Sequence, residues 1–295
     1  LHPGMVVALQ ANYLEAELED PPADVSPRLL CTRRTRLNHR GAAVHVGDRV
    51  SVEAIDREHA RAVVADVEPR SSFLVRPPVA NASCILVAVA VEQPAFDADQ
   101  VSRFLLTAEK TGLQVLLVLT KCDLLDTEAL SRLRYRLQGW GYEPILVSTQ
   151  SGLGLEQLRA QLATVPITVL CGPSGVGKSS LLNGLLPGLA LRVGEVSGRL
   201  QRGRHTTRHV ELHAFSPGSR VADTPGFNRP ELPDDVSNLE VLFPELRVQL
   251  EPHPCRFRDC LHRDEPGCGV TRDWERYPMY RRAVDELLGV SRPSR

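Results

Sequence analysis

A glycine-rich segment constrains the fold of this chain more than any other feature of the sequence. It consists of Gly172, Pro173, Ser174, Gly175, Val176, Gly177, Lys178 and Ser179, which satisfies the pattern G-x-x-x-x-G-K-[S/T]. An apolar run over residues 167–171 enters the segment, and helix-like sequence over residues 179–186 leaves it. This strand–loop–helix context indicates a phosphate-binding loop in an α/β domain rather than a chance glycine-rich turn.

The residue types of this loop suit a nucleoside polyphosphate. Its glycines let backbone N–H groups converge on phosphate oxygens at a helix N-terminus, where the helix dipole favours an anion. We expect Lys178 to reach the β- and γ-phosphates, and Ser179 to bind Mg²⁺, with Ser180 beside it in the site. The loop alone leaves an ATPase, a GTPase and a small-molecule kinase open.

A second motif, consisting of Thr120, Lys121, Cys122 and Asp123, favours guanine. It ends the apolar run 115–119, and ligands bind at the carboxyl ends of the strands in α/β sheets. A carboxylate there accepts from both N1–H and the N2 amine of guanine, whereas adenine offers no such pair and would leave the charge unpaired. The Lys121 stem can lie over the base. A backbone N–H beside Ser148, after the apolar run 145–147, can meet guanine O6.

A third motif, Asp223-Thr224-Pro225-Gly226, follows a short apolar run. We expect Asp223 to hold Mg²⁺ through water and the Gly226 N–H to sense the γ-phosphate. The polar, arginine-rich residues 192–208 look like a mobile loop and a first switch. Either Thr206 or Thr207 would complete the Mg²⁺ shell.

The order of these motifs is unusual, because the guanine motif precedes the phosphate loop whereas in most GTPases it comes last. The order predicts a circularly permuted GTPase whose second switch adjoins the C-terminal region. Phe227 follows the third motif, where many GTPases keep a glutamine that orients the attacking water. His205 is the nearest substitute in sequence, although a histidine in an arginine-rich loop can equally be solvated or face RNA.

Three cysteines and one histidine cluster near the C-terminus, in the pattern C-x4-C-x-H-x5-C. Cys255, Cys260, His262 and Cys268 offer a closed Cys3His shell, which predicts one structural Zn²⁺. A redox disulfide is the competing interpretation. Arg256 and Arg258 flank an aromatic residue beside the first cysteine and are candidate RNA contacts.

The N-terminal region predicts a small barrel. Short β-rich stretches over residues 4–9, 13–18, 29–34, 49–55 and 60–67 suit an OB-like fold. Residues 25–47 contain no acidic residue, and their arginines are Arg28, Arg33, Arg34, Arg36 and Arg40. We favour contact with nucleic acid for this basic stripe over an ordinary solvated strand face.

The remaining pattern divides the chain into three domains, at residues 1–72, 73–232 and 233–295. Apolar runs alternate with helix-like segments 97–111, 128–139 and 155–163 in the central part, which predicts a parallel sheet covered on both faces. We expect a linker at Pro77–Pro78 and a mostly helical C-terminal region, with helices over residues 236–246 and 274–288.

Composition adds limits on the partners. The net charge of −1 does not by itself indicate binding to nucleic acid, so any surface that binds nucleic acid must be a local basic patch. No apolar run approaches the length of a membrane span and no secretory leader is visible, so we expect a cytoplasmic protein without membrane contact. Lysine is rare, and Lys121 and Lys178 occur within the nucleotide motifs, which leaves only Lys110 outside them.

Taken together, the permuted motifs, the segment G-R-H-T-T around His205, the Cys3His pattern and the barrel-like start resemble the RsgA (YjeQ) family along essentially the whole chain. The resemblance implies a GTPase that binds the small ribosomal subunit late in assembly, is stimulated by it and leaves after hydrolysis. We also expect the chain to be a monomer. It also implies that the barrel and the zinc domain both touch ribosomal RNA, and that His205 matches a proposed catalytic histidine. Thr120 departs from the commoner asparagine.

Two rival functions remain from the residues alone. A P-loop ATPase or kinase is disfavoured by Asp123, and nucleotide binding with GDP and ADP separates it. A non-catalytic RNA-binding scaffold that uses GTP only structurally is kept open by Phe227.

Overall fold

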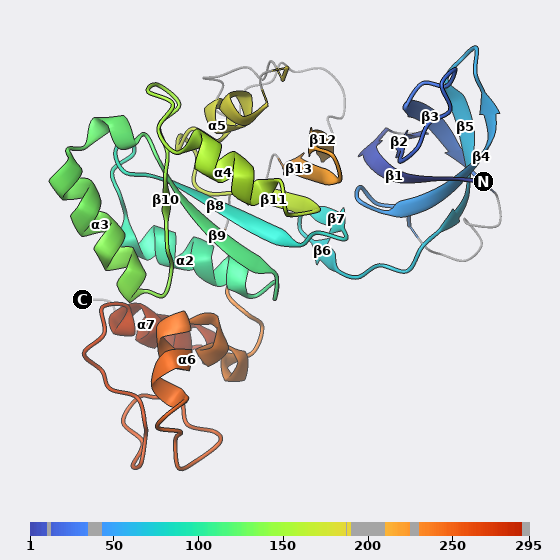
Figure 1. The fold of residues 1–295 in the computed structure, drawn as a ribbon. Coiled ribbons are helices and arrows are strands. Elements are labelled where there is room, and N and C mark those ends of the chain that lie inside the picture. The colour runs from blue at the N-terminus through green and yellow to red at the C-terminus, as the bar shows by residue number, and fades with distance from the viewer. Residues whose placement is uncertain (11–12, 35–42, 187, 190–209, 225–229, 291–295) are drawn as a thin grey trace, which may run out of the picture. The chain divides into compact units, whose positions relative to one another are not determined.

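The computed structural model describes residues 1–10, 13–34, 43–186, 188–189, 210–224 and 230–290. The chain divides into two compact units. Figure 1 labels their helices and strands. The first comprises residues 1–85, 159–170 and 194–227, and the second comprises 86–158, 171–193 and 228–295, each as far as it is described.

The five predicted N-terminal strands are confirmed and close into a barrel. They are β1 (His2–Leu9), β2 (Leu14–Leu18), β3 (Arg28–Arg33), β4 (Arg49–Asp56) and β5 (Arg61–Val67). Strand β1 pairs antiparallel with both β2 and β4. Strand β2 pairs antiparallel with β3, β3 pairs parallel with β5, and β5 pairs antiparallel with β4, so the ring is complete. Alternate side chains along β2 are buried, as expected for strands whose inner face forms a core. That core includes Val6, Leu14 and Val64.

The expected linker at Pro77–Pro78 is wrong, because these prolines belong to a β-hairpin. Strand β6 (Phe73–Val75) pairs antiparallel with β7 (Pro78–Ala80). Proline is tolerated as the first residue of a short strand, where its missing N–H breaks no ladder hydrogen bond.

The rest of the first unit includes strands β11 (Ile167–Cys171), β12 (Glu211–Ser216) and β13 (Ser219–Asp223). Strand β11 pairs parallel with β13, and β12 pairs antiparallel with β13. Strand β12 also pairs antiparallel with β1 through Ala8 and Glu211. The motif residue Asp223 therefore ends a strand next to β11, which leads into the phosphate loop.

The second unit contains both the guanine motif and the phosphate loop. Strands β8 (Cys84–Ala90), β9 (Gln114–Thr120) and β10 (Ile145–Leu146) lie in that order with β8 innermost, and β9 and β10 are parallel. The helices are α2 (Ala98–Glu109), α3 (Thr127–Gly139), α4 (Leu155–Leu162) and α5 (Lys178–Leu185). Every residue of β8 is buried, which explains its unbroken apolar sequence.

The C-terminal region differs from the predicted single helix over 236–246. Two 3-10 turns, Val236–Asn238 and Glu240–Leu242, precede helix α6 (Pro244–Leu250). Pro244 occupies the first helical position, where its missing N–H costs nothing, so the α-helix begins there. The last helix, α7 (Tyr277–Leu287), lies within the predicted range 274–288.

The C-terminal region packs against α2 of the same unit. Leu106 of α2 belongs to one apolar cluster with Phe243, Leu246 and Tyr280. Two hydrogen bonds fix the chain that leads into the region: Glu231 N donates to Thr107 Oγ1 at 2.8 Å, and Lys110 Nζ donates to the Leu232 carbonyl at 3.1 Å. The one lysine outside the nucleotide motifs thus anchors the segment that follows the third motif.

A fully buried cation joins the same two parts. Arg276 has no exposed surface and forms a bidentate ion pair with Glu245, in which its Nε lies 2.6 Å from Oε1. Its guanidinium carbon lies 4.9 Å from the centre of the Trp140 ring and 4.8 Å from that of Phe243. Trp140 ends α3, whereas the other residues belong to the C-terminal region, so Arg276 holds them together.

Candidate functional site

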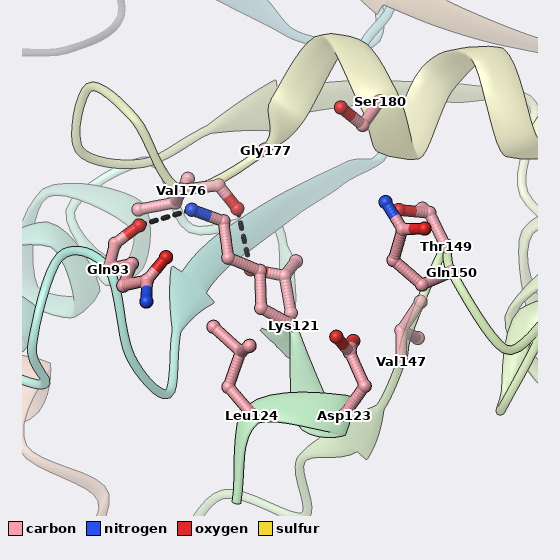
Figure 2. A pocket seen from close by; sticks show the side chains of 11 residues that line it. Gln93, Lys121, Asp123, Leu124, Val147, Thr149, Gln150, Val176, Gly177 and Ser180 are labelled. Carbon is pink, nitrogen blue, oxygen red and sulfur yellow. Dashed lines mark hydrogen bonds between the residues drawn. The ribbon is translucent and has the colours of Figure 1, made fainter.

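One pocket of about 240 Å³ brings the guanine motif and the phosphate loop together (Figure 2). The predicted site residues that line this pocket are Thr120, Lys121, Asp123, Val176, Gly177 and Ser180. The side chains of Lys121 and Asp123 come from the end of β9 and the turn after it. Two motifs separated by about fifty residues of sequence therefore face one cavity, which supports their joint use for one ligand.

The phosphate loop has the backbone geometry that its glycines predict. Gly172, Gly175 and Gly177 all have positive φ angles, which L-residues with a Cβ rarely adopt. A Cβ on Gly172 would lie 2.1 Å from the Ala88 carbonyl oxygen, so only glycine fits between the loop and β8. Helix α5 begins directly after Gly177, which leaves its N-terminal N–H groups at the loop.

Lys178 folds back over its own loop. Its Nζ donates to the carbonyl oxygens of Gly172 at 2.8 Å and Pro173 at 2.7 Å. Ser179 and Ser180 are half-buried in the first turn of α5, and Ser174 is exposed in the loop. The lysine therefore lies beside the space that the loop encloses, where an ammonium group would meet phosphate oxygens.

Asp123 is held by a neighbouring serine. Ser148 Oγ donates to Asp123 Oδ1, and Ser148 itself has no exposed surface. The Ser148 oxygen also accepts from the backbone N–H groups of Gln150 and Ser151, each at 3.2 Å. This network links the carboxylate to the turn after β10 and fixes its direction toward the pocket.

Lys121 adopts a left-handed backbone conformation with φ of 58°. Its Nζ donates to the Gly175 carbonyl at 2.9 Å and to the Gln93 carbonyl. Its stem consequently crosses one side of the pocket, as expected for a methylene chain that covers a planar base.

The thiol of Cys122 is buried and unreactive. Burial raises its pKa to about 11, and it lies against the Leu119 carbonyl. Cys122 thus contributes to the turn by packing and is not a nucleophile at neutral pH.

The structure adds pocket residues that the motifs did not single out: Gln93, Leu124, Val147, Thr149 and Gln150. Thr149 follows Ser148 directly, so the predicted N–H beside Ser148 falls on a residue that lines the pocket. The Ser148 N–H itself is taken by the Leu153 carbonyl at 3.0 Å. Gln93 follows β8 and is brought to the site by topology alone, so no sequence motif marks it.

Several predicted residues lie outside the described part of the chain. These are His205, Thr206, Thr207, Gly226, Phe227, Arg36 and Arg40, and the side chain of Asp223. Thr224 of the third motif is described and buried, and its Oγ1 donates to the Leu170 carbonyl at 2.9 Å.

The predicted zinc ligands converge as a set. One ligand atom each from Cys255, Cys260, His262 and Cys268 lies within 4.8 Å of the others. His262 Nδ1 lies 3.4, 3.6 and 3.5 Å from the three sulfur atoms in that order, and the sulfurs of Cys255 and Cys268 are 3.9 Å apart. A tetrahedral Zn²⁺ with ordinary bond lengths requires separations of about 3.6 Å for S–N and about 3.8 Å for S–S. The four residues therefore fit zinc.

A carboxylate forms a hydrogen bond with His262 through the ring nitrogen that does not face the thiols. Glu240 Oε2 lies 2.8 Å from His262 Nε2, so the imidazole presents Nδ1 to the thiols and donates its other N–H to Glu240. Burial raises the pKa of the Cys260 thiol to about 12 in the protein without metal. Metal binding must therefore release that proton.

The described arginines of the basic stripe are partly engaged within the protein. Arg28 forms ion pairs of 2.7 Å with Glu15 and Glu211, and Arg34 pairs with Glu53. Arg33 is exposed at the end of β3. In the C-terminal region, the Arg256 guanidinium lies over the exposed Phe257 ring, and Arg258 is exposed beside it.

Comparison with known proteins gives one family. The family model described as RsgA GTPase matches residues 67–233. A protein of Synechococcus sp. (strain CC9311) named small ribosomal subunit biogenesis GTPase RsgA is 77% identical over 292 residues, which cover 99% of this chain and 96% of that relative. A relative of the same name from Synechococcus sp. (strain CC9605) is 68% identical with the same coverage.

Solved structures of similar fold extend over the whole chain. YjeQ from Thermotoga maritima has a TM-score of 0.80 and 32% identity, and covers 98% of this chain and 99% of its own. YloQ, described as a circularly permuted GTPase, has a TM-score of 0.78 and 27% identity, and covers 99% and 97%. These similarities confirm the predicted order of a barrel, a permuted P-loop domain and a C-terminal helical region.

Proposed function

This chain belongs to the RsgA GTPase family, and we propose that it is a late assembly factor of the small ribosomal subunit that is released after it hydrolyses GTP. Members of this family are GTP hydrolases, so the enzyme class follows from membership. Its partners are the small ribosomal subunit and the RNA of that subunit, by analogy with the names of its relatives.

The observation that carries the proposal is the shared pocket. The Asp123 carboxylate lines one cavity with Val176 and Gly177 of the phosphate loop, which supports a ligand that carries both a guanine-like donor edge and phosphates. An ATP-dependent kinase or ATPase is disfavoured, because adenine presents no pair of donors to a carboxylate at the base-binding end of the pocket.

We assign the nucleotide contacts residue by residue. Asp123 accepts from the guanine base, Lys121 covers it, and Thr120, Cys122 and Ser148 shape the turns that hold them. The loop contacts are Gly172, Pro173, Ser174, Gly175, Val176, Gly177, Lys178, Ser179 and Ser180. The Gly226 N–H meets the γ-phosphate. Mg²⁺ neutralises phosphate charge in such sites, and its holders here are Ser179, Asp223 through water, and Thr206 or Thr207.

Catalysis in this proposal uses His205, since Phe227 cannot orient water through a polar side chain. The imidazole would hold the attacking water when small subunits order the switch loop. Release after hydrolysis follows from the loss of γ-phosphate contacts at the switches, which frees the RNA-facing loop.

The outer domains supply the RNA contacts. We propose the domain boundaries 1–72, 73–232 and 233–295, with Arg28, Arg33, Arg34, Arg36 and Arg40 on the barrel, and Arg256 and Arg258 at the zinc centre, facing RNA. Zinc bound by Cys255, Cys260, His262 and Cys268 would keep the second of these surfaces folded. No helix among the described residues combines the length and apolar character that crossing a membrane requires. We propose a cytoplasmic monomer without membrane contact.

GTP turnover titrated with isolated small and large ribosomal subunits tests this proposal. We expect stimulation by small subunits and little by large ones. Equal turnover in both titrations, or none, would refute the assembly role. Binding of small subunits without any turnover would instead favour an RNA-binding scaffold that uses GTP structurally.

A further inference from the structure

The β6–β7 hairpin carries an exposed aromatic side chain on the first unit. Phe73 is 39% exposed to solvent, and the Arg70 guanidinium carbon lies 4.8 Å from the centre of its ring. The His45 ring approaches the same phenyl ring, with centroids 4.8 Å apart and planes tilted by 51°. Three planar groups therefore meet at one place on the surface. We call Phe73, Arg70 and His45 the planar cluster.

The cluster rests on rigid backbone. The Ala80 N–H donates to the Val46 carbonyl at 2.8 Å, and the Asn81 side chain donates to the Gly47 carbonyl at 2.9 Å. Gly47 permits this approach, because a Cβ there would lie 2.0 Å from the Ala80 oxygen. The hairpin and the segment that bears His45 are thus held together by hydrogen bonds.

A buried carboxylate fixes the cation of the cluster. Asp48 has no exposed surface, and its two oxygens accept from Arg70 Nε at 2.7 Å and Nη2 at 2.9 Å. The Arg70 Nη2 also donates to the Ala43 carbonyl at 2.7 Å. These bonds hold the guanidinium group over the phenyl ring, so the pair is in place before any partner binds.

The charge around the cluster favours a polyanion. Asp48 is neutralised by Arg70, and Arg33 lies close enough to act electrostatically on His45. Burial, followed by the charges of Arg70 and Arg33, lowers the pKa of His45, so its ring is neutral at pH 7. A neutral imidazole offers a flat stacking surface, while Arg33 offers the positive charge.

We infer that the planar cluster of Phe73, Arg70 and His45, with Arg33 beside it, binds an unpaired segment of RNA by stacking with its bases. Unpaired bases stack on phenyl, imidazole and guanidinium planes, and cations nearby hold the phosphates. A double helix hides its base faces and does not fit such a surface. The inference names the RNA partner more closely and rests on the proposed function only in that a ribosome assembly factor meets RNA.

Apart from Arg33, this surface does not use the arginines that the sequence predicted for RNA contact. Arg28 and Arg34 of that set already pair with carboxylates, so their charges are partly satisfied within the protein. The planar cluster instead depends on stacking, which salt weakens less than it weakens phosphate contacts.

The test measures the affinity of the full chain, in GDP and without ribosomes, for a fluorescent single-stranded RNA of about 16 nucleotides, the upper site size of an OB barrel. The Phe73→Leu variant, which keeps an apolar side chain but loses the plane, should bind about tenfold more weakly. The Phe73→Tyr variant should retain the affinity. The Arg33→Gln variant should reduce the dependence of log affinity on log salt by about one unit.

Val75→Thr is the matched control, because Val75 is exposed two residues along the same strand and is not planar. It should bind RNA like the unmodified chain. Unchanged GDP affinity and melting temperature show that each variant is folded.

Three outcomes would overturn the inference: no RNA binding by the unmodified chain, equal binding by Phe73→Leu, or equal affinity for a duplex of the same sequence. If Phe73→Leu loses affinity only for intact small subunits, the cluster binds a ribosomal protein. Because the RNA assay contains no subunits and no GTP, its result is independent of the turnover test of the proposed function.

Discussion

The hydroxyl of Thr120 lies 2.6 Å from the carbonyl oxygen of Val176, so the guanine motif is hydrogen-bonded directly to the phosphate loop. Both residues are almost completely buried, at 5% and 1% exposure. The same hydroxyl oxygen lies 3.2 Å from the Val89 carbonyl at the end of β8. Asparagine is commoner at this position, and the contact shows that threonine can also tie the loop to the base-reading strand.

We expect Thr120→Val to weaken GDP binding about fivefold to tenfold. Valine preserves the shape but leaves the buried Val176 carbonyl without this donor, at a cost of about 1–3 kcal/mol shared between stability and binding. Calorimetric titration with GDP measures the effect. Thr120→Ser retains the hydroxyl and should remain close to the unmodified chain, and equal loss in both variants would show that packing rather than the hydrogen bond matters.

The Cys3His cluster predicts one tightly bound zinc ion per chain. The separations among the sulfur atoms and His262 Nδ1 match a tetrahedral site, and the Cys260→Ala variant removes one of four ligands. Elemental analysis should find one zinc in the unmodified chain and much less in the variant. GDP affinity should persist in the variant because the phosphate loop lies far from the cluster in sequence. Zinc-free protein purified without chelators would end this prediction.

Glu240 should set the strength of that zinc site without touching the metal. Its carboxylate accepts from His262 Nε2, and loss of such a partner costs about 10–100-fold in metal affinity. We expect Glu240→Gln to fall in this range when zinc is competed with a chromophoric chelator. Glu251→Gln changes another exposed carboxylate of the region and should have no effect.

Replacing Arg276 should lower the stability of the C-terminal region strongly, but only while Glu245 is present. Arg276→Met should destabilise the C-terminal region by about 3–5 kcal/mol, because it strands the Glu245 carboxylate, whose side chain is only 8% exposed. Urea unfolding followed by tryptophan fluorescence reports on this region, since Trp140 and Trp274 are the only tryptophans. The double variant Arg276→Met, Glu245→Met should recover much of the loss. A double variant no better than the single one would mean that the aromatic stacking on Arg276 dominates.

His205 should matter only in the stimulated reaction. We expect His205→Ala to spare GTP binding and subunit binding but to remove most of the acceleration by small subunits, since a supplied positioning group is worth about 10³–10⁵ in rate. Single-turnover hydrolysis with and without small subunits measures it. Full stimulated turnover in the variant would reduce His205 to a phosphate contact.

Motif-bearing parts of the chain could be predicted from sequence because each motif has its own local requirement. Gly172, Gly175 and Gly177 mark positive φ angles, and the apolar runs of β8 and β9 mark buried parallel strands. The Cys3His cluster could be predicted because its four residues lie within fourteen residues of sequence.

Features that depend on long-range contact could not be predicted in the same way. The β6–β7 hairpin looked like a proline linker, because its strands are only three residues long and the contacts that hold it reach the distant carbonyls of Val46 and Gly47. Gln93 enters the pocket only because β8 and β9 are neighbours, and Arg276 becomes buried only when the C-terminal region packs on α2 and α3. Arg28 and Arg34 looked free in sequence, and their acidic partners lie on other strands.

The most direct test of the account is nucleotide affinity for the unmodified chain and for Asp123→Asn, measured with GDP, ADP and xanthosine diphosphate. Asparagine keeps an oxygen that can accept from Ser148, so the turn should remain folded. We expect the unmodified chain to bind GDP far more tightly than ADP. We also expect Asp123→Asn to lose a few kcal/mol of GDP binding, since each hydrogen bond to a charge is worth about 1.5–3 kcal/mol, and to gain affinity for xanthosine diphosphate. Unchanged GDP affinity in a folded Asp123→Asn variant, or equal affinity of the unmodified chain for ADP, would contradict the account.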